Sequence, residues 1–345
     1  MSSLSERPHD IFLSLTGQRF SRRRALALAA TGAFALLPAA CGSSQGAGAS
    51  GPAAAPTLRL AFQPPYIAVF VLQQQKLLEK VLGSSTSIQY RRLLSLDPIS
   101  EAIAGGSVDL GMGGTPIGAI ASNQPIRILA LVEHSPKTHA ILVRPNSSIK
   151  SIADLKGKKI GTPTGRNNVF VLRALQEASI KDSEVQWLKL ENNEGQSALV
   201  TGAIDAWQTW DPFYANAQLS KEAIALVDGE RYIQNYVAIF GRADYIEKYP
   251  DTLKQFLKAY KQALDYVKAH HSEAVNLFVQ QNKLSSSVAE LTFNRREYLL
   301  HAPTSDYIAD VADQSKRLHQ AGVIQNEPDW SRVVDTTIAS QVLSS

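Results

Sequence analysis

The stretch 161-GTPTGRNN-168 combines residue types that could hold an anion. It joins an apolar run to a segment with helical spacing, and Gly165 lets the backbone approach a ligand closely. The first amides of a helix have no partner inside it, and the helix dipole strengthens their attraction for negative charge. Four neighbouring side chains can add charge and hydrogen bonds: Thr164, Arg166, Asn167 and Asn168. We expect an anion site here, the alternative being a capped helix with Arg166 in solvent.

Three other junctions between an apolar run and a helical pattern share this polar, glycine- or proline-rich character: 61-AFQPPY-66, 111-GMGGTP-116 and 207-WQTWDPFY-214. In open α/β sheets, ligands bind beyond the carboxyl ends of the strands, so these junctions should meet at one site. They supply the candidate ligand-binding residues Gln63, Tyr66, Gly114, Thr115, Trp210 and Asp211. Trp207 is expected in the core and Asp211 as a helix cap, whereas pocket and core remain equally open for Tyr66 and Trp210.

The sequence lacks the motifs of several enzyme and cofactor classes. It contains neither of the nucleotide-binding motifs G-x-x-x-x-G-K-[ST] and G-x-G-x-x-G. The G-x-S-x-G motif that carries a hydrolase nucleophile is also absent. The seven histidines show no metal-ligand spacing with acids or cysteine, and His270-His271 is expected on a solvated helix face. His139 precedes a predicted strand and is expected outside the ligand site. We therefore expect no catalytic residue, no metal and no cofactor.

The net charge of +4 is concentrated at the N-terminus. Residues 1–40 contain five of the 35 lysines and arginines but two of the 31 acids, so the remaining 305 residues are nearly neutral. Such a body has no basic run of the kind that binds nucleic acid. Arg22-Arg23-Arg24 precede an apolar stretch too short to span a bilayer, which is typical of an export signal and resembles the twin-arginine motif.

Cys41 is the single cysteine and cannot form an internal disulfide. It follows 37-LPAA-40 and precedes a Gly/Ala/Ser/Pro run, 42–56, that is expected to be a flexible tether. This arrangement resembles a bacterial lipobox, although Pro38 stands where leucine is usual. We expect a lipid anchor at Cys41, the alternative being cleavage that leaves a soluble exported protein.

From residue 57 onward, strand-like and helix-like segments alternate, which predicts an α/β architecture with parallel sheets. Beyond about residue 245 helical patterns dominate, beginning with one long amphipathic helix over 246–271. We expect two lobes, with the chain crossing between them near 140–145 and 235–240.

Four stretches, taken in order, resemble the periplasmic solute-binding proteins for aliphatic sulfonates, taurine and nitrate. They are 101-EAIAGGSVDLGMGG-114, 152-IADLKGKKIGTPTG-165, 172-LRALQEA-178 and 203-AIDAWQTWDPFYANA-217. The resemblance covers roughly residues 57–335. It implies the type II periplasmic binding protein fold, in which two α/β lobes are joined by a hinge of two crossing strands. The expected parts are an export signal (1–40), a tether (41–56), lobe 1 (57–142), lobe 2 (143–237) and a return to lobe 1 with C-terminal helices (238–345).

The resemblance also implies which residues contact ligand: Gln63, Tyr66, Gly114, Thr115, Gly165, Arg166, Asn167, Trp210 and Asp211. Sulfonate binders of this type often have Gly-Asp where this chain has Gly114-Thr115, and the missing acid argues against an amino group on the ligand, as in taurine. We expect Arg166 to supply the charge for the anionic head. Tyr66 and Trp210, with Pro64 and Pro65, would pack against the remainder of the ligand.

The expected function is that of a non-enzymatic, monomeric binding component of an ABC importer on the periplasmic or outer face of the cell membrane. It would capture an alkane- or arylsulfonate, or a sulfate ester, and deliver it to a membrane permease. One alternative is a binding protein for a thiamine-precursor pyrimidine or other aromatic, in which Arg166 is incidental. Another is an exported hydrolase that uses Asp211 with His139.

Overall fold

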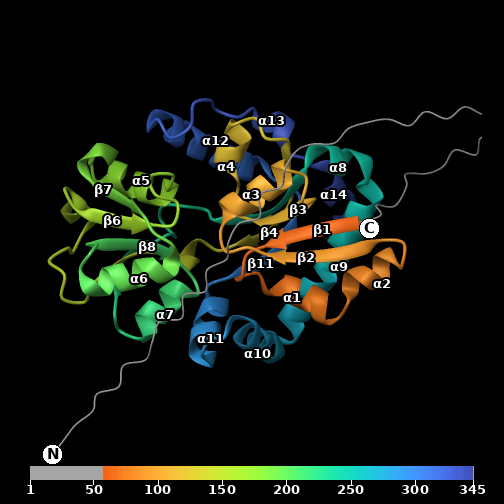
Figure 1. Ribbon diagram of the computed structural model, residues 1–345, viewed down its shortest axis with the longest axis horizontal. Coiled ribbons are helices and arrows are strands. Elements are labelled where there is room, and N and C mark those ends of the chain that lie inside the picture. The colour runs from red at the N-terminus through yellow and green to blue at the C-terminus, as the bar shows by residue number, and fades with distance from the viewer. Residues whose placement is uncertain (1–56, 345) are drawn as a thin grey trace, which may run out of the picture. The chain divides into compact units, whose positions relative to one another are not determined.

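The computed structural model describes residues 57–344, which form two β-sheets with helices around them (Figure 1). The strands of the first sheet, in spatial order, are β11 (Glu297–His301), β4 (Ile126–His134), β10 (Tyr236–Arg242), β3 (Leu110–Gly113), β1 (Thr57–Phe62) and β2 (Ser87–Arg92). Those of the second are β7 (Gln186–Lys189), β6 (Lys159–Thr162), β8 (Ala206–Trp210), β5 (His139–Val143) and β9 (Ile224–Asp228). The predicted signal, tether and Cys41 lie outside the described residues.

Both sheets are mixed: they contain the expected parallel pairs and also antiparallel ones. In the first sheet β1 runs parallel to β2 and β3, but β10 runs antiparallel to β3 and β4. In the second sheet β6 runs parallel to β7 and β8, but β5 runs antiparallel to β8 and β9. Each of β5 and β10 is the first strand after the chain changes sheets. Parallel strands are normally joined through a crossover helix, and no such helix precedes β5 or β10. Each of them therefore runs antiparallel to its neighbours.

The chain changes sheets through the short 3-10 helix η1 (Pro136–Thr138), between β4 and β5, and again between β9 and β10. The first change comes slightly earlier than the predicted 140–145. Strand β5 therefore lies in the second sheet, although the predicted end of lobe 1 at residue 142 falls inside it. The remaining 3-10 helices are η2 (Ile152–Leu155) and η3 (Asp182–Glu184).

Helices cover both faces of each sheet. Along β1, Leu60 and Ala61 point to opposite faces and belong to separate apolar clusters. The Leu60 cluster contains helices α1 (Ile67–Gln74), α2 (Leu77–Leu82), α8 (Ala243–Lys248), α9 (Pro250–Ala269), α10 (His271–Asn282), α11 (Ser286–Asn294) and α14 (Thr337–Leu343). The Ala61 cluster contains α3 (Leu96–Ala104), α4 (Ile117–Ala121), α12 (Ser305–Gln320) and α13 (Trp330–Val333). On the second sheet, α5 (Val169–Glu177) packs on one face, and α6 (Asn192–Thr201) and α7 (Phe213–Leu219) pack on the other.

The single helix expected over 246–271 is three helices, α8, α9 and the start of α10. Helix α8 ends at Lys248, and α9 begins at Pro250. Proline has no backbone N–H to continue a helix but is well suited to its first position. The proline therefore starts a new helix inside an amphipathic pattern that looked continuous.

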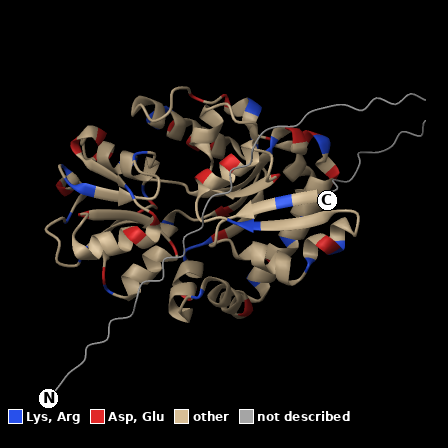
Figure 2. Ribbon diagram, viewed as in Figure 1, with Lys and Arg blue, Asp and Glu red and all other residues tan. Residues whose placement is uncertain are grey.

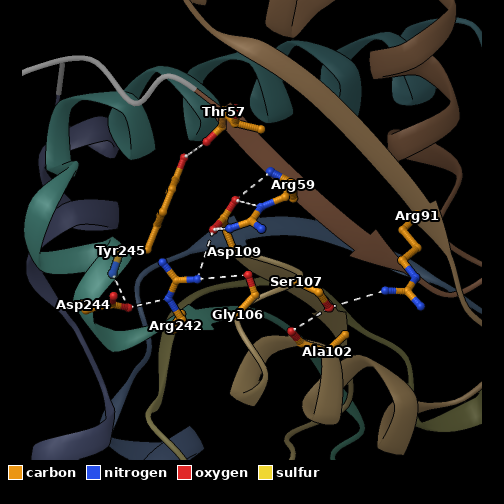
Figure 3. A network of polar contacts seen from close by, with 10 residues as sticks. All are labelled: Thr57, Arg59, Arg91, Ala102, Gly106, Ser107, Asp109, Arg242, Asp244 and Tyr245. Carbon is orange, nitrogen blue, oxygen red and sulfur yellow. Dashed lines mark hydrogen bonds and ion pairs between the residues drawn. The ribbon is translucent and has the colours of Figure 1, made fainter. Parts of the chain in front are cut away.

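An ion-pair network holds together the amino-terminal ends of β1 and β3 in the first sheet (Figure 3). The Asp109 carboxylate is buried and accepts from the backbone N–H of Arg59 at 2.9 Å, from its Nε at 2.9 Å and from its Nη2 at 2.7 Å. Arg242, at the end of β10, approaches the same carboxylate at 3.5 Å. Tyr245 Oη donates to the Thr57 carbonyl at 3.0 Å, so the first described residue is also held. The network therefore lies at the opposite end of these strands from their carboxyl ends, where the candidate site lies.

Charge is spread over the described residues, with Lys and Arg interspersed among Asp and Glu (Figure 2). Within residues 57–344, no helix is both long and apolar enough to cross a membrane.

Candidate functional site

A cavity of about 650 Å³ opens at the carboxyl ends of parallel strands from both sheets. The residues after β1 and β3 line it from the first sheet, and those after β6 and at the end of β8 line it from the second. Eight of the predicted ligand-binding residues line this cavity: Gln63, Tyr66, Gly114, Thr115, Thr164, Asn167, Asn168 and Trp210. The cavity thus brings together all four junctions that the sequence singled out.

Hydrogen bonds hold the first-sheet side chains in place. Tyr66 Oη donates to Gln63 Oε1 at 3.3 Å, and Gln63 Nε2 donates to the Leu94 carbonyl at 3.3 Å. Thr115 Oγ1 lies 2.8 Å from the hydroxyl of Tyr307 on helix α12. Burial raises the pKa of both tyrosines, so both hydroxyls remain protonated and can act as donors. This side of the cavity therefore offers hydroxyl and amide groups on a rigid support.

Gly165 does not line the cavity, but its backbone shapes the loop that does. Its φ is +56°, in the left-handed region that glycine adopts without strain. The loop is closed by a hydrogen bond from Gly165 N–H to the Thr162 carbonyl at 3.2 Å. Helix α5 then begins at Val169, with the Asn168 side chain accepting from the Val171 N–H at 3.1 Å.

Arg166 does not line the cavity, although it was predicted to supply the charge there. Its Nε donates to Asp182 Oδ2 at 2.5 Å, and its side chain is 46 % exposed. Asp182 begins the 3-10 helix η3 and so brings its carboxylate to the outer side of the Arg166 loop. Arg166 is therefore neutralised by a partner on the surface, and the structure does not support it as the charge that meets a ligand.

Asp211 is also absent from the cavity lining and is fully buried behind it. It accepts from the Ala215 N–H at 2.9 Å, at the start of α7, and pairs with Arg295 at 3.0 Å. Burial raises the pKa of Asp211 to about 6, while Arg295 and Arg296 act in the opposite direction. Pro212 is the N-cap of α7, but Asp211, one residue earlier, still accepts from an amide of the first turn, and a ligand contact is not supported. Trp207 is fully buried, which confirms its placement in the core.

A buried ion pair lines the cavity, formed by Arg296 and Glu133, and neither residue was among the predicted site residues. The Arg296 side chain is 4 % exposed, and its Nη1 donates to Glu133 Oε1 at 2.6 Å. Nε is buried and has no hydrogen-bond partner among the residues that the structure describes. Burial lowers the pKa of Arg296, but Glu133, Tyr298 and Asp211 together raise it by more, so the net direction is upward. The guanidinium is therefore charged, and Glu133 engages only one of its terminal nitrogens.

His139 lines the cavity as well, although it was expected outside it. Its ring packs against Trp210, with centroids 5.6 Å apart and an angle of 35° between the planes. Burial and the neighbouring Arg296 lower the pKa of His139 to about 3, so the imidazole is neutral at physiological pH. The local sequence gave no signal of this, because His139 is the first residue of β5, directly after the chain has changed sheets.

Closer to solvent, a second-sheet strand and a first-sheet helix meet across the cavity. Lys189 Nζ, on β7, lies 3.4 Å from Asp97 Oδ2, on α3, and both side chains are exposed. In the described part of the chain, no cluster of three or more histidine, cysteine or acidic side chains is placed to hold a metal ion. The arrangement is a polar cavity between two sheets, with one buried arginine–glutamate pair, several neutral donors and aromatic walls.

The fold and this cavity define a class, the two-lobed periplasmic binding proteins. The alkanesulfonate-binding protein of Xanthomonas axonopodis pv. citri, solved bound to MOPS, is similar in structure, with a TM-score of 0.77 and 23 % identity. The comparison covers 82 % of this chain and 99 % of that one. The periplasmic aliphatic sulphonate binding protein of Escherichia coli gives a TM-score of 0.76 at 24 % identity, covering 82 % and 92 %. These likenesses confirm the predicted fold class.

The sequence comparisons agree with the structural ones. The family described as NMT1/THI5 like matches residues 97–274, just over half of the chain, and the chain belongs to this family. A relative in Escherichia coli (strain K12), named "Putative aliphatic sulfonates-binding protein", is 28 % identical over 264 residues. That match covers 76 % of this chain and 82 % of the relative. The resemblance predicted from the four sequence stretches is thereby confirmed.

Proposed function

We propose that this protein is the substrate-binding component of an ABC importer and captures a small organic sulfonate or sulfate ester between its two lobes. The observation that carries the proposal is the buried Arg296 guanidinium, which faces a cavity built from the carboxyl ends of strands in both sheets. A guanidinium offers directional N–H groups that match the oxygens of an anionic head. The names of the three similar proteins described above refer to sulfonate binding and support the same ligand class.

The head group would lie near Arg296, and the rest of the ligand would pack against aromatic walls. Tyr66 and Trp210 provide these walls, as predicted, and Tyr236 adds a third ring. The cavity volume of about 650 Å³ leaves room for an organic substituent beyond the sulfonate. We propose that closure of the lobes on the ligand presents it to a membrane permease, without turnover.

The proposal includes export and anchoring, which concern residues outside 57–344. The signal over 1–40 would direct the protein to the periplasm or the outer face of the membrane, and Cys41 would carry the lipid. Residues 42–56 would then be the tether between the lipid and the start of β1 at Thr57. Mass spectrometry of the protein isolated from its own cells tests this. An N-terminal diacylglyceryl cysteine at 41 is expected, and a mature chain that begins after residue 41 contradicts the anchor.

A thermal-shift screen tests the ligand class. The panel contains alkane- and arylsulfonates including MOPS, sulfate esters, taurine, nitrate and pyrimidines, with the full-length protein purified in buffer free of sulfonates. A ligand at about 100 Kd stabilises the folded state by roughly 2.7 kcal/mol. We expect sulfonates to raise the unfolding midpoint. Taurine should raise it less, because Thr115 stands where an aspartate could have paired with the taurine ammonium. Shifts from uncharged pyrimidines alone contradict a sulfonate, and chemical conversion of any panel member contradicts a pure binding role.

A further inference from the structure

A chain of hydrogen bonds leads from the start of helix α5 to His139 and fixes where the imidazole carries its hydrogen. It begins at the Val171 backbone N–H, which can only donate, and which donates to Asn168 Oδ1 at 3.1 Å. The other end of the Asn168 amide is therefore its NH₂ group. Nδ2 of Asn168 donates to Gln208 Oε1 at 2.7 Å, which in turn identifies the NH₂ end of Gln208.

Gln208 passes this polarity on to the histidine. Its Nε2 donates to the Thr209 carbonyl at 3.2 Å and lies 3.3 Å from His139 Nδ1. An amide nitrogen has no lone pair to accept with, so Nδ1 of His139 must be the acceptor. In a neutral imidazole the hydrogen is then on Nε2. Each step follows from a backbone N–H, and none depends on a free choice of amide orientation.

The chain is rigid because its members are buried. Gln208 is fully buried, Asn168 is 7 % exposed, and both lie on elements of the second sheet, β8 and the start of α5. The His139 ring is also held by its contact with Trp210. Nε2 of His139 has no hydrogen-bond partner among residues 57–344, although the residue lines the cavity. A donor of fixed direction is therefore available there.

We propose that His139 is a ligand-binding residue that donates a hydrogen bond from Nε2 to an oxygen of the bound anion, as a neutral imidazole held in one tautomer by Asn168 and Gln208. This rests on the proposed function, because the acceptor is the sulfonate or sulfate head. Arg296 supplies the positive charge from the first sheet, and His139 supplies an uncharged donor from the second. An anion that bridges the two would favour the closed arrangement of the lobes.

The charged groups around His139 are consistent with this division of roles. Arg296 acts electrostatically on the imidazole, and it is itself paired with Glu133. With the pKa of His139 at about 3, the imidazole stays neutral through the physiological range. Sulfonate affinity should therefore be flat between about pH 5 and pH 8, whereas binding through an imidazolium would strengthen as the pH falls through about 6.5.

Nitrogen-15 NMR of the histidine-labelled protein, without ligand, tests the tautomer. The His139 signals are assigned by their loss in His139→Phe. We expect one pyridine-type and one pyrrole-type nitrogen, with the hydrogen on Nε2, unchanged between about pH 5 and pH 8. Gln208→Met removes the donor to Nδ1 and should give a mixture of tautomers with His139 still present. An imidazolium, or a hydrogen on Nδ1 in the unchanged protein, overturns the inference.

Titration with MOPS tests the contact with the anion. We expect His139→Phe, which keeps a ring beside Trp210, to weaken binding by at least about tenfold. His139→Gln, which can place an amide N–H near the position of Nε2, should retain binding within about threefold. His319→Phe, an exposed change outside the cavity, is the control. Equal affinity of unchanged and His139→Phe protein overturns the contact while the proposed function stands. If no sulfonate binds the unchanged protein, the proposed function and the contact both fail, and the tautomer is still decided by NMR.

Discussion

Replacing Arg296 by methionine should weaken sulfonate binding strongly, whereas the matched change Arg166→Met should leave it nearly unchanged. Arg296 is buried, lines the cavity and is paired with Glu133, while Arg166 is paired with Asp182 on the surface. A hydrogen bond to a charged group contributes about 1.5–3 kcal/mol, which corresponds to roughly a 10- to 150-fold increase in Kd. Exposed ion pairs contribute little, so we expect Arg166→Met to stay within about twofold.

A loss of binding in Arg296→Met must be separated from a loss of folding. The substitution leaves Glu133 buried without its partner, and removing one member of a buried ion pair costs about 3–5 kcal/mol of stability. The double variant Arg296→Met, Glu133→Met removes both charges and replaces them by apolar side chains of similar volume. Such replacements are often neutral for stability. The double variant should therefore fold normally and still fail to bind the anion.

Calorimetric titration with MOPS and butanesulfonate measures Kd for all three variants, and circular dichroism melting reports whether each is folded. The reasoning is refuted if the folded double variant binds a sulfonate within about twofold of the unchanged protein. It is equally refuted if Arg166→Met loses as much affinity as the double variant. That second result would return the ligand charge to the loop after β6, where the sequence alone had placed it.

Three further changes have expected effects that denaturant or thermal unfolding can measure. Asp109→Asn should lower the free energy of unfolding in urea by about 3–5 kcal/mol, because it leaves Arg59 beside a buried neutral group. A loss below about 1 kcal/mol would show that the network in Figure 3 does not hold the ends of β1 and β3 together. The pKa of Asp211 is raised to about 6 in the folded state, above its ordinary 3.8, so the native state binds more protons and stability falls as the pH rises from about 4 to 6. Asp211→Asn should remove about 3 kcal/mol of that fall, and an identical pH dependence would contradict the raised value. Arg173→Met breaks ion pairs to Asp310 and Asp313 on α12 and should cost about 1–3 kcal/mol, with an unchanged midpoint as the contrary result.

The positions of the strand-to-helix junctions could be predicted from local sequence. Gln63, Thr115 and Asn168 each follow an apolar run and precede a helical pattern, and the ends of parallel strands must share one edge. No long-range information is needed for that step. The helix boundary at Pro250 shows the limit of prediction from local sequence. A single proline starts a new helix there, although the apolar pattern continues on both sides of it.

The charges of the site could not be predicted in the same way. Arg166 stands in the most anion-like stretch, but its partner Asp182 is set by a 3-10 helix that the sequence pattern does not reveal. Arg296 comes from a connection between α11 and β11, remote in sequence from every junction. Only the pairing of β11 with β4 brings it to Glu133. Whether an arginine lies on the surface or lines the cavity therefore depends on tertiary contacts.

The adjacent residues Arg295 and Arg296 each form a buried ion pair, one with each sheet. Arg296 pairs with Glu133 on β4 of the first sheet, whereas Arg295 pairs with Asp211, which follows β8 of the second. Both carboxylates are buried, so neither pair can exchange easily with water. A movement of the second sheet that shifts Asp211 would act on Arg295 and, through one peptide bond, on the backbone that positions Arg296.

Asp211→Asn should therefore change the affinity for MOPS, although Asp211 does not line the cavity. If binding and lobe closure are linked through Arg295, the effects of Asp211→Asn and Arg295→Met on affinity will not add, because each removes the same connection. A double-mutant cycle measured by calorimetry gives the coupling, which we expect to be about 1–3 kcal/mol. Additive effects, or no effect of Asp211→Asn on affinity, would show that the second arginine pair stabilises the fold and does not report on the ligand.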